Sequence, residues 1–134
     1  MVGASGAIGN ALLTRLLADD SFSAAVGLSR SGYPALDLTS ERSIAEAANY
    51  ITHLSLPLRL VLDATGFLHD NIDMPEKSWR QLDPRHMARA FAVNAIGPAM
   101  LMKNFLPLLS RDGKSVFATL SARVGSINDN DLGG

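Results

Sequence analysis

The sequence predicts a doubly wound α/β fold, in which helices cover both faces of a parallel β-sheet. Short apolar runs alternate with helix-forming runs along the whole chain. A turn with three glycines, Gly3, Gly6 and Gly9, stands directly before the first helix-forming run. The run at 58–64 is almost entirely apolar, which is typical of a central strand in a parallel sheet. This alternation predicts right-handed crossovers between neighbouring strands.

Five strand segments follow from the apolar runs. The first is very short, because only Met1 and Val2 precede the glycine turn. The other four are expected at 24–29, 35–38, 58–64 and 115–120. In doubly wound sheets, ligands bind beyond the carboxyl ends of the strands. The glycine turn and the segments that follow the later strands all fall at that edge.

Three helices are predicted between these strands. Apolar residues at helical spacing predict the first helix at 8–18. Thr39 or Ser40 caps a second helix with Ile44 on its apolar face. A third, long helix begins at Asp83-Pro84 and runs to about residue 109, because an N-cap residue followed by proline is a helix start signal.

The composition excludes several classes of function. The chain has 134 residues, which predicts one domain at 1–134. It has no cysteine, so disulfides and thiolate catalysis are excluded, and its three histidines show no metal-ligand spacing. A net charge of -1 gives no electrostatic basis for binding nucleic acid. No apolar run reaches the length of a membrane span, so we expect a cytoplasmic protein with no nucleic-acid or membrane partner.

The glycine turn predicts a phosphate site. Residues without a Cβ let a pyrophosphate approach the backbone, and the helix that follows supplies N–H groups and a positive dipole end. Ser5 adds a hydroxyl donor to this turn. The alternative is a tight strand-to-helix turn that binds no ligand.

Two charged residues bear on the identity of the nucleotide. Arg30 follows the second strand, where a basic residue pairs with a 2′-phosphate and an acidic residue would favour NAD. The sequence therefore favours NADP over NAD, with a solvated surface arginine as the alternative. Asp37 ends the third strand, where it can accept a hydrogen bond from the adenine amino group or shape the turn before the next helix.

Asn94 has a local feature suited to a proton relay. Pro98 lies four residues later and has no N–H to close a helical hydrogen bond onto the Asn94 carbonyl. We expect this carbonyl to hold a water, with a local kink at Gly97. The alternative is an ordinary kinked helix with a buried, hydrogen-bonded asparagine.

The run at 75–109 resembles the short-chain dehydrogenase/reductase family. The resemblance includes "DATG" (63–66) before this run and "SARVGS" (121–126) after it. In detail the chain looks most like the C-factor-like carbonyl reductases. The match covers essentially the whole chain, and Val93-Asn94 is its most specific part.

The resemblance implies a Rossmann sheet, of which about five of the usual seven strands are present. It implies hydride transfer between NADP, or NAD, and a small-molecule carbonyl or alcohol substrate. It implies Ser121 and Asn94 as catalytic residues, and a homo-oligomer, dimer or tetramer, formed through the long helix. The implied cofactor contacts are Gly3, Ser5, Gly6, Ile8 and Gly9 at the pyrophosphate, Arg30 at the ribose phosphate, Asp37 and Leu38 at the adenine, and Ala64, Thr65 and Gly66 toward the nicotinamide.

The chain departs from the family in its glycine spacing and its serine. Glycines three residues apart are closer to the extended, epimerase-like branch, which stays an alternative. Counting back from Gly125, the catalytic position falls on Ala122, while a one-residue slip restores Ser121 and Ser126 is a further candidate.

The family's catalytic Tyr-x-x-x-Lys pair is absent, because Tyr33 is followed four residues on by Asp37 and Tyr50 by Leu54. In relatives this pair comes shortly after a stretch like residues 128–134, so we expect a chain truncated at both ends. The leading hypothesis is an NADP(H)-dependent short-chain reductase or its N-terminal part. The alternative from another class is a catalytically silent nucleotide-binding or interaction module.

Overall fold

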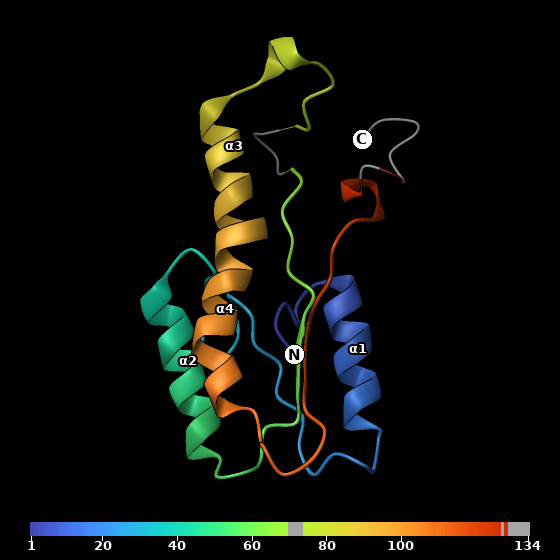
Figure 1. The fold of residues 1–134 in the computed structure, drawn as a ribbon, viewed down its shortest axis with the longest axis vertical. Coiled ribbons are helices and arrows are strands. Elements are labelled where there is room, and N and C mark those ends of the chain that lie inside the picture. Colours follow the sequence, from blue (N-terminus) through green and yellow to red (C-terminus); the bar gives the residue numbers. More distant parts are fainter. Residues whose placement is uncertain (70–73, 127, 129–134) are drawn as a thin grey trace.

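Helices lie on both sides of a set of parallel strand segments (Figure 1). The computed structural model describes residues 1–69, 74–126 and 128. In Figure 1, α1 lies on one side of the strands, and α2 and α4 lie on the other. The elements are α1 (Ala7–Leu17), α2 (Glu41–His53), β1 (Leu60–Asp63), α3 (Pro84–Phe91), α4 (Gly97–Phe105) and β2 (Val116–Thr119).

The sheet has the order of a doubly wound fold. Strands β1 and β2 pair in parallel, with Leu60 opposite Val116. Val2 forms parallel bridges to β1 on one side and to Leu28 on the other, and Ser29 bridges Ala35. Across the sheet, the five segments therefore follow the order third, second, first, fourth, fifth. This order confirms the α/β, Rossmann-type fold class predicted from the sequence, with its sheet incomplete.

Only the fourth and fifth segments form regular strands. The segments predicted at 24–29 and 35–38 are joined to the sheet by single bridges. Between segment 24–29 and β1 lie only Met1 and Val2, so most backbone groups of that segment have no neighbouring strand to pair with. The sequence identified the positions of these segments correctly and overestimated their regularity.

The helix starts agree with their predicted caps. Ser40, and not Thr39, caps α2, because its Oγ accepts a hydrogen bond from the N–H of Ser43 at 3.3 Å. Asp83 caps α3 by accepting from the N–H of Arg85 at 2.7 Å, with Pro84 at the first helical position. These caps confirm the helix boundaries read from the sequence to within one residue.

The predicted long helix is interrupted by a π-helical turn. Helix α3 passes into η2 (Ala92–Ile96), which passes into α4 and then into a 3-10 turn, η3 (Leu106–Leu108). At the junction, the N–H of Gly97 donates to the carbonyl of Ala92. A Cβ on Gly97 would lie 2.9 Å from the Cβ of Leu38, so only glycine allows this close approach. Two further 3-10 turns are η1 (Trp79–Gln81) and η4 (Arg123–Gly125).

The core lies between the strands and the α2–α4 layer. Leu101 and Phe105 of α4 are almost completely buried, together with Val2, Ile44 and Val61. Phe105 on the predicted long helix is therefore a core residue. None of the helices in the described part of the chain is long and apolar enough to cross a membrane.

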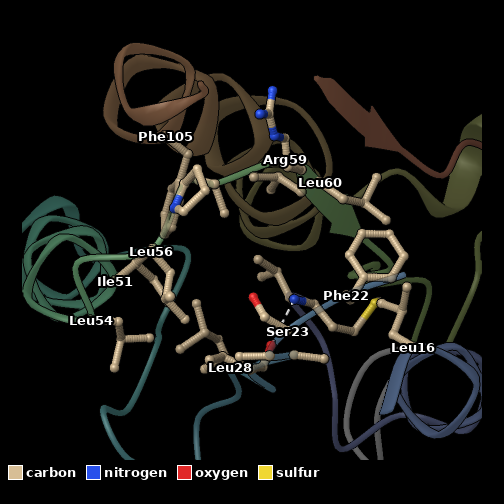
Figure 2. Close-up of a pocket in the computed structure, with 18 of the residues that line it drawn as sticks. Leu16, Phe22, Ser23, Leu28, Ile51, Leu54, Leu56, Arg59, Leu60 and Phe105 are labelled. Atoms are coloured by element: carbon tan, nitrogen blue, oxygen red, sulfur yellow. Dashed lines mark hydrogen bonds between the residues drawn. The ribbon is translucent and has the colours of Figure 1, made fainter. Parts of the chain in front are cut away.

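An apolar cavity of about 260 Å³ opens at the amino ends of the strands (Figure 2). It lies between segments 23–26 and 57–60. Leu16 and Phe22 cover one side of it, and Ile51 and Phe105 cover the other. The sequence did not predict this cavity, because its walls come from every layer of the fold.

Candidate functional site

A cleft of about 500 Å³ lies at the carboxyl ends of the strands, where the glycine turn meets the ends of the second, third and fourth segments. Its lining residues are Gly3, Ser5, Gly6, Ser29, Arg30, Leu36, Asp37, Leu38, Thr39, Ala64, Thr65, Gly66, Phe67, His69, Arg89 and Val93. The position agrees with the general rule for ligands in doubly wound sheets.

The cleft brings together all the predicted cofactor residues except Ile8 and Gly9. Ile8 is 62% exposed and does not line the cleft. Gly9 is buried within the first turn of α1. Gly9 therefore shapes the turn from behind, while Gly3, Ser5 and Gly6 face the open space.

The glycine turn is tightly folded on its own backbone. Gly3 has φ +79°, a conformation that favours glycine, and its N–H donates to the carbonyl of Leu28 at 2.9 Å. A Cβ on Gly9 would lie 2.0 Å from the carbonyl oxygen of Gly3. Gly6 begins α1 without any side-chain cap, so N–H groups of the first helical turn lack an acceptor from their own helix. Such a helix start is suited to hold phosphate oxygens.

Arg30 and Asp37 lie on the same side of the cleft. Arg30 is exposed, so its guanidinium is accessible to a ligand. The Asp37 carboxylate accepts hydrogen bonds from the N–H of Thr39 at 2.9 Å and from its hydroxyl at 2.7 Å. These bonds, the backbone one first, hold the pKa of Asp37 below its usual value, and the charge of Arg30 adds a smaller effect. Asp37 therefore shapes the turn before α2 and lines the cleft as well.

A buried carboxylate fixes the end of β1. Asp63 is 1% exposed and accepts hydrogen bonds from the N–H of Thr65 at 3.0 Å and its hydroxyl at 2.5 Å. Its second oxygen accepts from the hydroxyl of Thr119 in β2 at 2.7 Å. Asp63 therefore joins the two strands to the 64–66 turn, which places the backbone of that turn against the cleft.

Asn94 holds the segment that follows this turn. Its Oδ1 accepts from the N–H of Phe67 at 2.7 Å, and its Nδ2 donates to the Phe67 carbonyl at 2.6 Å. The water site at the Asn94 carbonyl stays a prediction. The side chain of Asn94 acts on the cleft through Phe67.

Residues on α3 and η2 complete this end of the cleft. The guanidinium of Arg89 lies 4.4 Å from the centre of the Phe67 ring, and Val93 follows one helical turn later. Sequence reasoning did not single out Phe67, His69 or Arg89 as ligand contacts. Arg89 and Val93 are four residues apart, so they share a helix face. That spacing is the sequence feature that could have pointed to Arg89 as a residue of the cleft.

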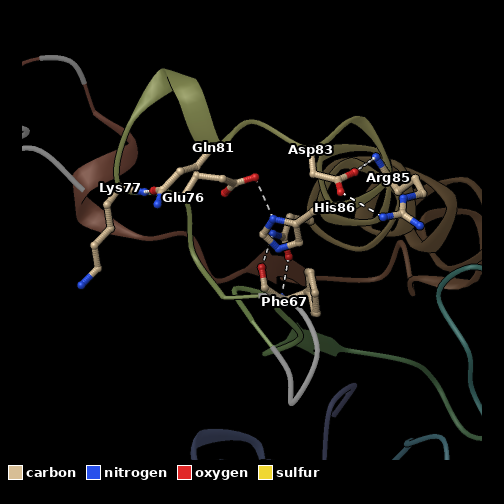
Figure 3. A network of polar contacts seen from close by, with 8 residues as sticks. Phe67, Glu76, Lys77, Gln81, Asp83, Arg85 and His86 are labelled. Carbon is tan, nitrogen blue, oxygen red and sulfur yellow. Dashed lines mark hydrogen bonds and ion pairs between the residues drawn. The ribbon is translucent and has the colours of Figure 1, made fainter.

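A polar network anchors the chain between the cleft and α3 (Figure 3). The ring Nδ1 of buried His86 lies 2.8 Å from Glu76 Oε1. This contact holds the pKa of Glu76 below its usual value. The imidazole also meets the ring of Phe67 edge-on, with centroids 5.5 Å apart. Glu76, His86 and Phe67 therefore pack as one unit beside the cleft.

The predicted catalytic serine lies outside this cleft. Ser121 is exposed and follows β2, where the N–H of Leu120 donates to the carbonyl of Asp63. The other candidates for the catalytic serine position, Ala122 and Ser126, are exposed too. Residues 127 and 129–134 lie outside the described part of the chain. The rings of Tyr33 and Tyr50 contact each other at 6.0 Å, and neither tyrosine lines the cleft.

Comparisons with known proteins reveal similarity in structure. No protein-family model matches the sequence, and no curated protein matches it either. The carbonyl reductase Sniffer of Caenorhabditis elegans matches with a TM-score of 0.86 at 20% identity, over 99% of this chain and 66% of that one. An NADPH-bound carbonyl reductase from chicken fatty liver matches with a TM-score of 0.78 at 22% identity, over 98% and 61%.

A third structure, an alcohol dehydrogenase of Thermococcus sibiricus complexed with 5-hydroxy-NADP, matches with a TM-score of 0.77 at 21% identity, over 95% of this chain and 58% of that one. The chain therefore spans about three fifths of the length of these proteins. Similarity at this level of identity establishes a common architecture. The chain has the Rossmann-type α/β fold of carbonyl reductases and short-chain dehydrogenases.

Proposed function

We propose that the cleft binds NADP(H), and that this chain carries the cofactor-binding part of a short-chain oxidoreductase. One observation carries the proposal: a single cleft joins the glycine turn, Arg30, Asp37 and the 64–66 turn. In the proposed reaction, hydride passes between the nicotinamide and a small-molecule carbonyl or alcohol. Two proteins of the same fold contain NADPH or an NADP derivative, which supports this choice of cofactor.

The residues of the cleft fit such a nucleotide. The uncapped start of α1 offers N–H groups to the pyrophosphate, and Gly3 and Gly6 keep side chains out of its way. Arg30 is accessible for a 2′-phosphate, which a guanidinium can bind through two hydrogen bonds. A Cβ on Gly66 would meet nothing within 4 Å, so the space at the nicotinamide end is open. The bound cofactor would supply the hydride.

The chain's own residues would position these groups. Asn94 fixes the backbone of Phe67 and thereby the wall of the cleft beside Gly66. Ser121 would orient the substrate carbonyl from the end of β2. We assign no proton donor, because neither tyrosine lines the cleft. A homo-oligomer, dimer or tetramer, completes the proposal and rests on the family resemblance. The proposed cytoplasmic location rests on the sequence analysis instead.

Titration by intrinsic NADPH fluorescence tests the cofactor assignment. Arg30→Ala is expected to weaken NADPH binding about tenfold or more, because a hydrogen bond to a charged group contributes about 1.5 to 3 kcal/mol. Binding of NADH, which lacks the 2′-phosphate, should change little. Arg42→Ala is the matched control, since Arg42 is exposed on α2 and pairs with Glu46 at 2.8 Å. Equal losses for both nucleotides, or no binding by the parent chain, would contradict the proposal.

The second candidate is a catalytically silent nucleotide-binding module. The exposed Ser121 and the mutual contact of Tyr33 and Tyr50 favour it. Mixing the protein with NADPH and a generic ketone distinguishes the two candidates. Oxidation of NADPH supports the reductase, and saturable binding without oxidation supports the silent module.

A further inference from the structure

Two arginines are among the described residues that line the cleft. Arg30 follows the second strand segment, and Arg89 stands on α3, which continues through η2 into the helical layer opposite α1 (Figure 1). Asp37 lines the cleft as well, and hydrogen bonds from Thr39 hold the pKa of its carboxyl below the usual value. The charges of Arg30 and Asp37 therefore offset each other. Among the described arginine, lysine and carboxylate side chains of the cleft, Arg89 supplies the remaining positive charge.

The guanidinium of Arg89 is held in place by an aromatic ring. It lies 4.4 Å from the centre of the Phe67 ring. The backbone of Phe67 is fixed in turn by two hydrogen bonds with the Asn94 amide, and its ring meets that of His86 edge-on (Figure 3). A guanidinium stacked on a fixed ring has few orientations left to lose, so it can bind an anion at a small entropic cost.

The segment that holds Arg89 is in direct contact with the glycine turn. A Cβ on Gly3 would lie 3.0 Å from the carbonyl of Ala64. Phe67 follows three residues after Ala64, and its ring lies against Arg89. The 64–66 turn therefore joins the glycine turn to the stacked pair of Phe67 and Arg89, and all of them line the same cleft of about 500 Å³.

Arg89 lies on the part of α3 that borders the cleft. Val93, one helical turn later in η2, also lines the cleft and packs against the core. Arg85, one turn earlier, pairs instead with the cap residue Asp83 at 3.2 Å and does not line the cleft. Arg89 is exposed, so its guanidinium is accessible to a ligand.

We propose that Arg89 is an anion-binding residue of the cleft, and that it binds the pyrophosphate of the dinucleotide together with the N–H groups at the start of α1. This inference rests on the proposed cofactor function. The pyrophosphate is the anion that the glycine turn is suited to hold, and residues 64–67 join Arg89 to that turn. A guanidinium can bind two phosphate oxygens at once. The 2′-phosphate stays assigned to Arg30.

Fluorescence titration of NADPH and NADH against charge variants tests this assignment. Arg89→Gln is expected to raise the Kd of both nucleotides by a similar factor, about fivefold or more, because both contain the pyrophosphate. Arg89→Lys keeps the charge without the paired donors, so it should recover part of this loss for both nucleotides. Arg85→Gln is the matched control, because it removes the same charge from the same helix outside the cleft. Its Kd values should stay within about twofold of those of the parent chain.

Ionic strength separates a phosphate contact from a purely structural effect. Salt screens the attraction between Arg89 and the pyrophosphate, so the gap between Arg89→Gln and the parent chain should narrow to about twofold at about 1 M salt. If Arg89→Gln raised the Kd only because Phe67 had moved, the gap would be the same at every salt concentration.

Three results would overturn this inference. The first is an Arg89→Gln variant that binds both nucleotides as tightly as the parent chain does. The second is a loss confined to NADPH, which would assign Arg89 to the 2′-phosphate. The third is a loss that neither salt nor Arg89→Lys reduces, which would make Arg89 a support for Phe67 alone. If the parent chain binds neither nucleotide, the proposed cofactor function fails as well, whereas the three results above leave that function intact.

Discussion

Individual glycines of this chain meet different physical demands. Gly3 adopts a φ of +79°, which side chains other than hydrogen rarely tolerate. Gly9 has an ordinary helical position, but its hydrogen faces the Gly3 carbonyl where no carbon fits. Gly66 has neither constraint, because a Cβ there meets nothing within 4 Å. The same residue type therefore has different roles at these three positions.

Alanine substitution at two of these glycines separates the roles. Gly9→Ala should destabilise the protein by about 2 to 3 kcal/mol, because the new Cβ lies 2.0 Å from a backbone oxygen that must shift. Gly66→Ala, the matched control, should change stability by less than about 0.5 kcal/mol. Urea denaturation followed by circular dichroism measures both. Similar losses at the two sites would show that the turn is not held by this close contact.

At the scale of elements, the π-helical turn links α3 to the cleft. A π-helical turn places one extra residue in the helix, and such turns are frequent at functional sites. In this protein it contains Asn94, whose amide reaches Phe67, and it ends at Gly97, which packs against Leu38. The π-helical turn and Gly97 therefore contact two segments that line the cleft.

Removing the Asn94 side chain tests this link. Asn94→Ala should cost about 1 kcal/mol and speed exchange of the Phe67 amide about fivefold, because that N–H loses its acceptor. Asn104→Ala is the control, since Asn104 donates to the Met100 carbonyl of its own helix at 2.9 Å. Unchanged exchange at Phe67 in Asn94→Ala would mean that this segment is held by its ring contacts alone.

For the whole molecule, the order of the five segments creates two openings at opposite ends of the sheet. At the carboxyl ends, loops diverge around the glycine turn and leave the polar cleft. At the amino ends, the apolar cavity opens beside Met1 and Val2. The same topology therefore explains the proposed cofactor site and the apolar cavity.

The stability of the whole protein should depend on pH through Met1. Burial lowers the pKa of its amine from 8.0 to about 6, so between these values the unfolded chain binds more protons. Stability should therefore rise from pH 6 to pH 8, by at most about 3 kcal/mol. Denaturation midpoints across this range measure the effect, and N-terminal acetylation should abolish it. A pH-independent midpoint over this range would contradict a buried amine.

A second effect of pH on stability is expected in the acid range. Hydrogen bonds from Thr39 lower the pKa of Asp37 in the folded protein. The ionised carboxylate therefore stabilises the fold at pH values above its unfolded-state pKa, and this stabilisation is lost as the pH falls through the lowered, folded-state pKa. The protein should therefore lose stability in acid as well.

The sequence by itself determined the fold class, the helix starts and most of the cleft. Caps such as Asp83 and turns such as Gly3–Gly9 depend on a few neighbouring residues, so they can be recognised in the sequence. Arg30, Asp37 and Gly66 were found because parallel strands bring their carboxyl ends to one edge.

Only the tertiary structure decided the rest, because it depends on contacts between distant segments. Three such features are the exclusion of Ile8 from the cleft wall, the bond of Asn94 to Phe67 and the place of Arg89 in that wall, which depend on how α1, α3 and η2 pack. The burial of Asp63 between two strands, and the walls of the apolar cavity, likewise require distant segments to meet. Local spacing specifies which residues share an element, and packing specifies which elements share a site.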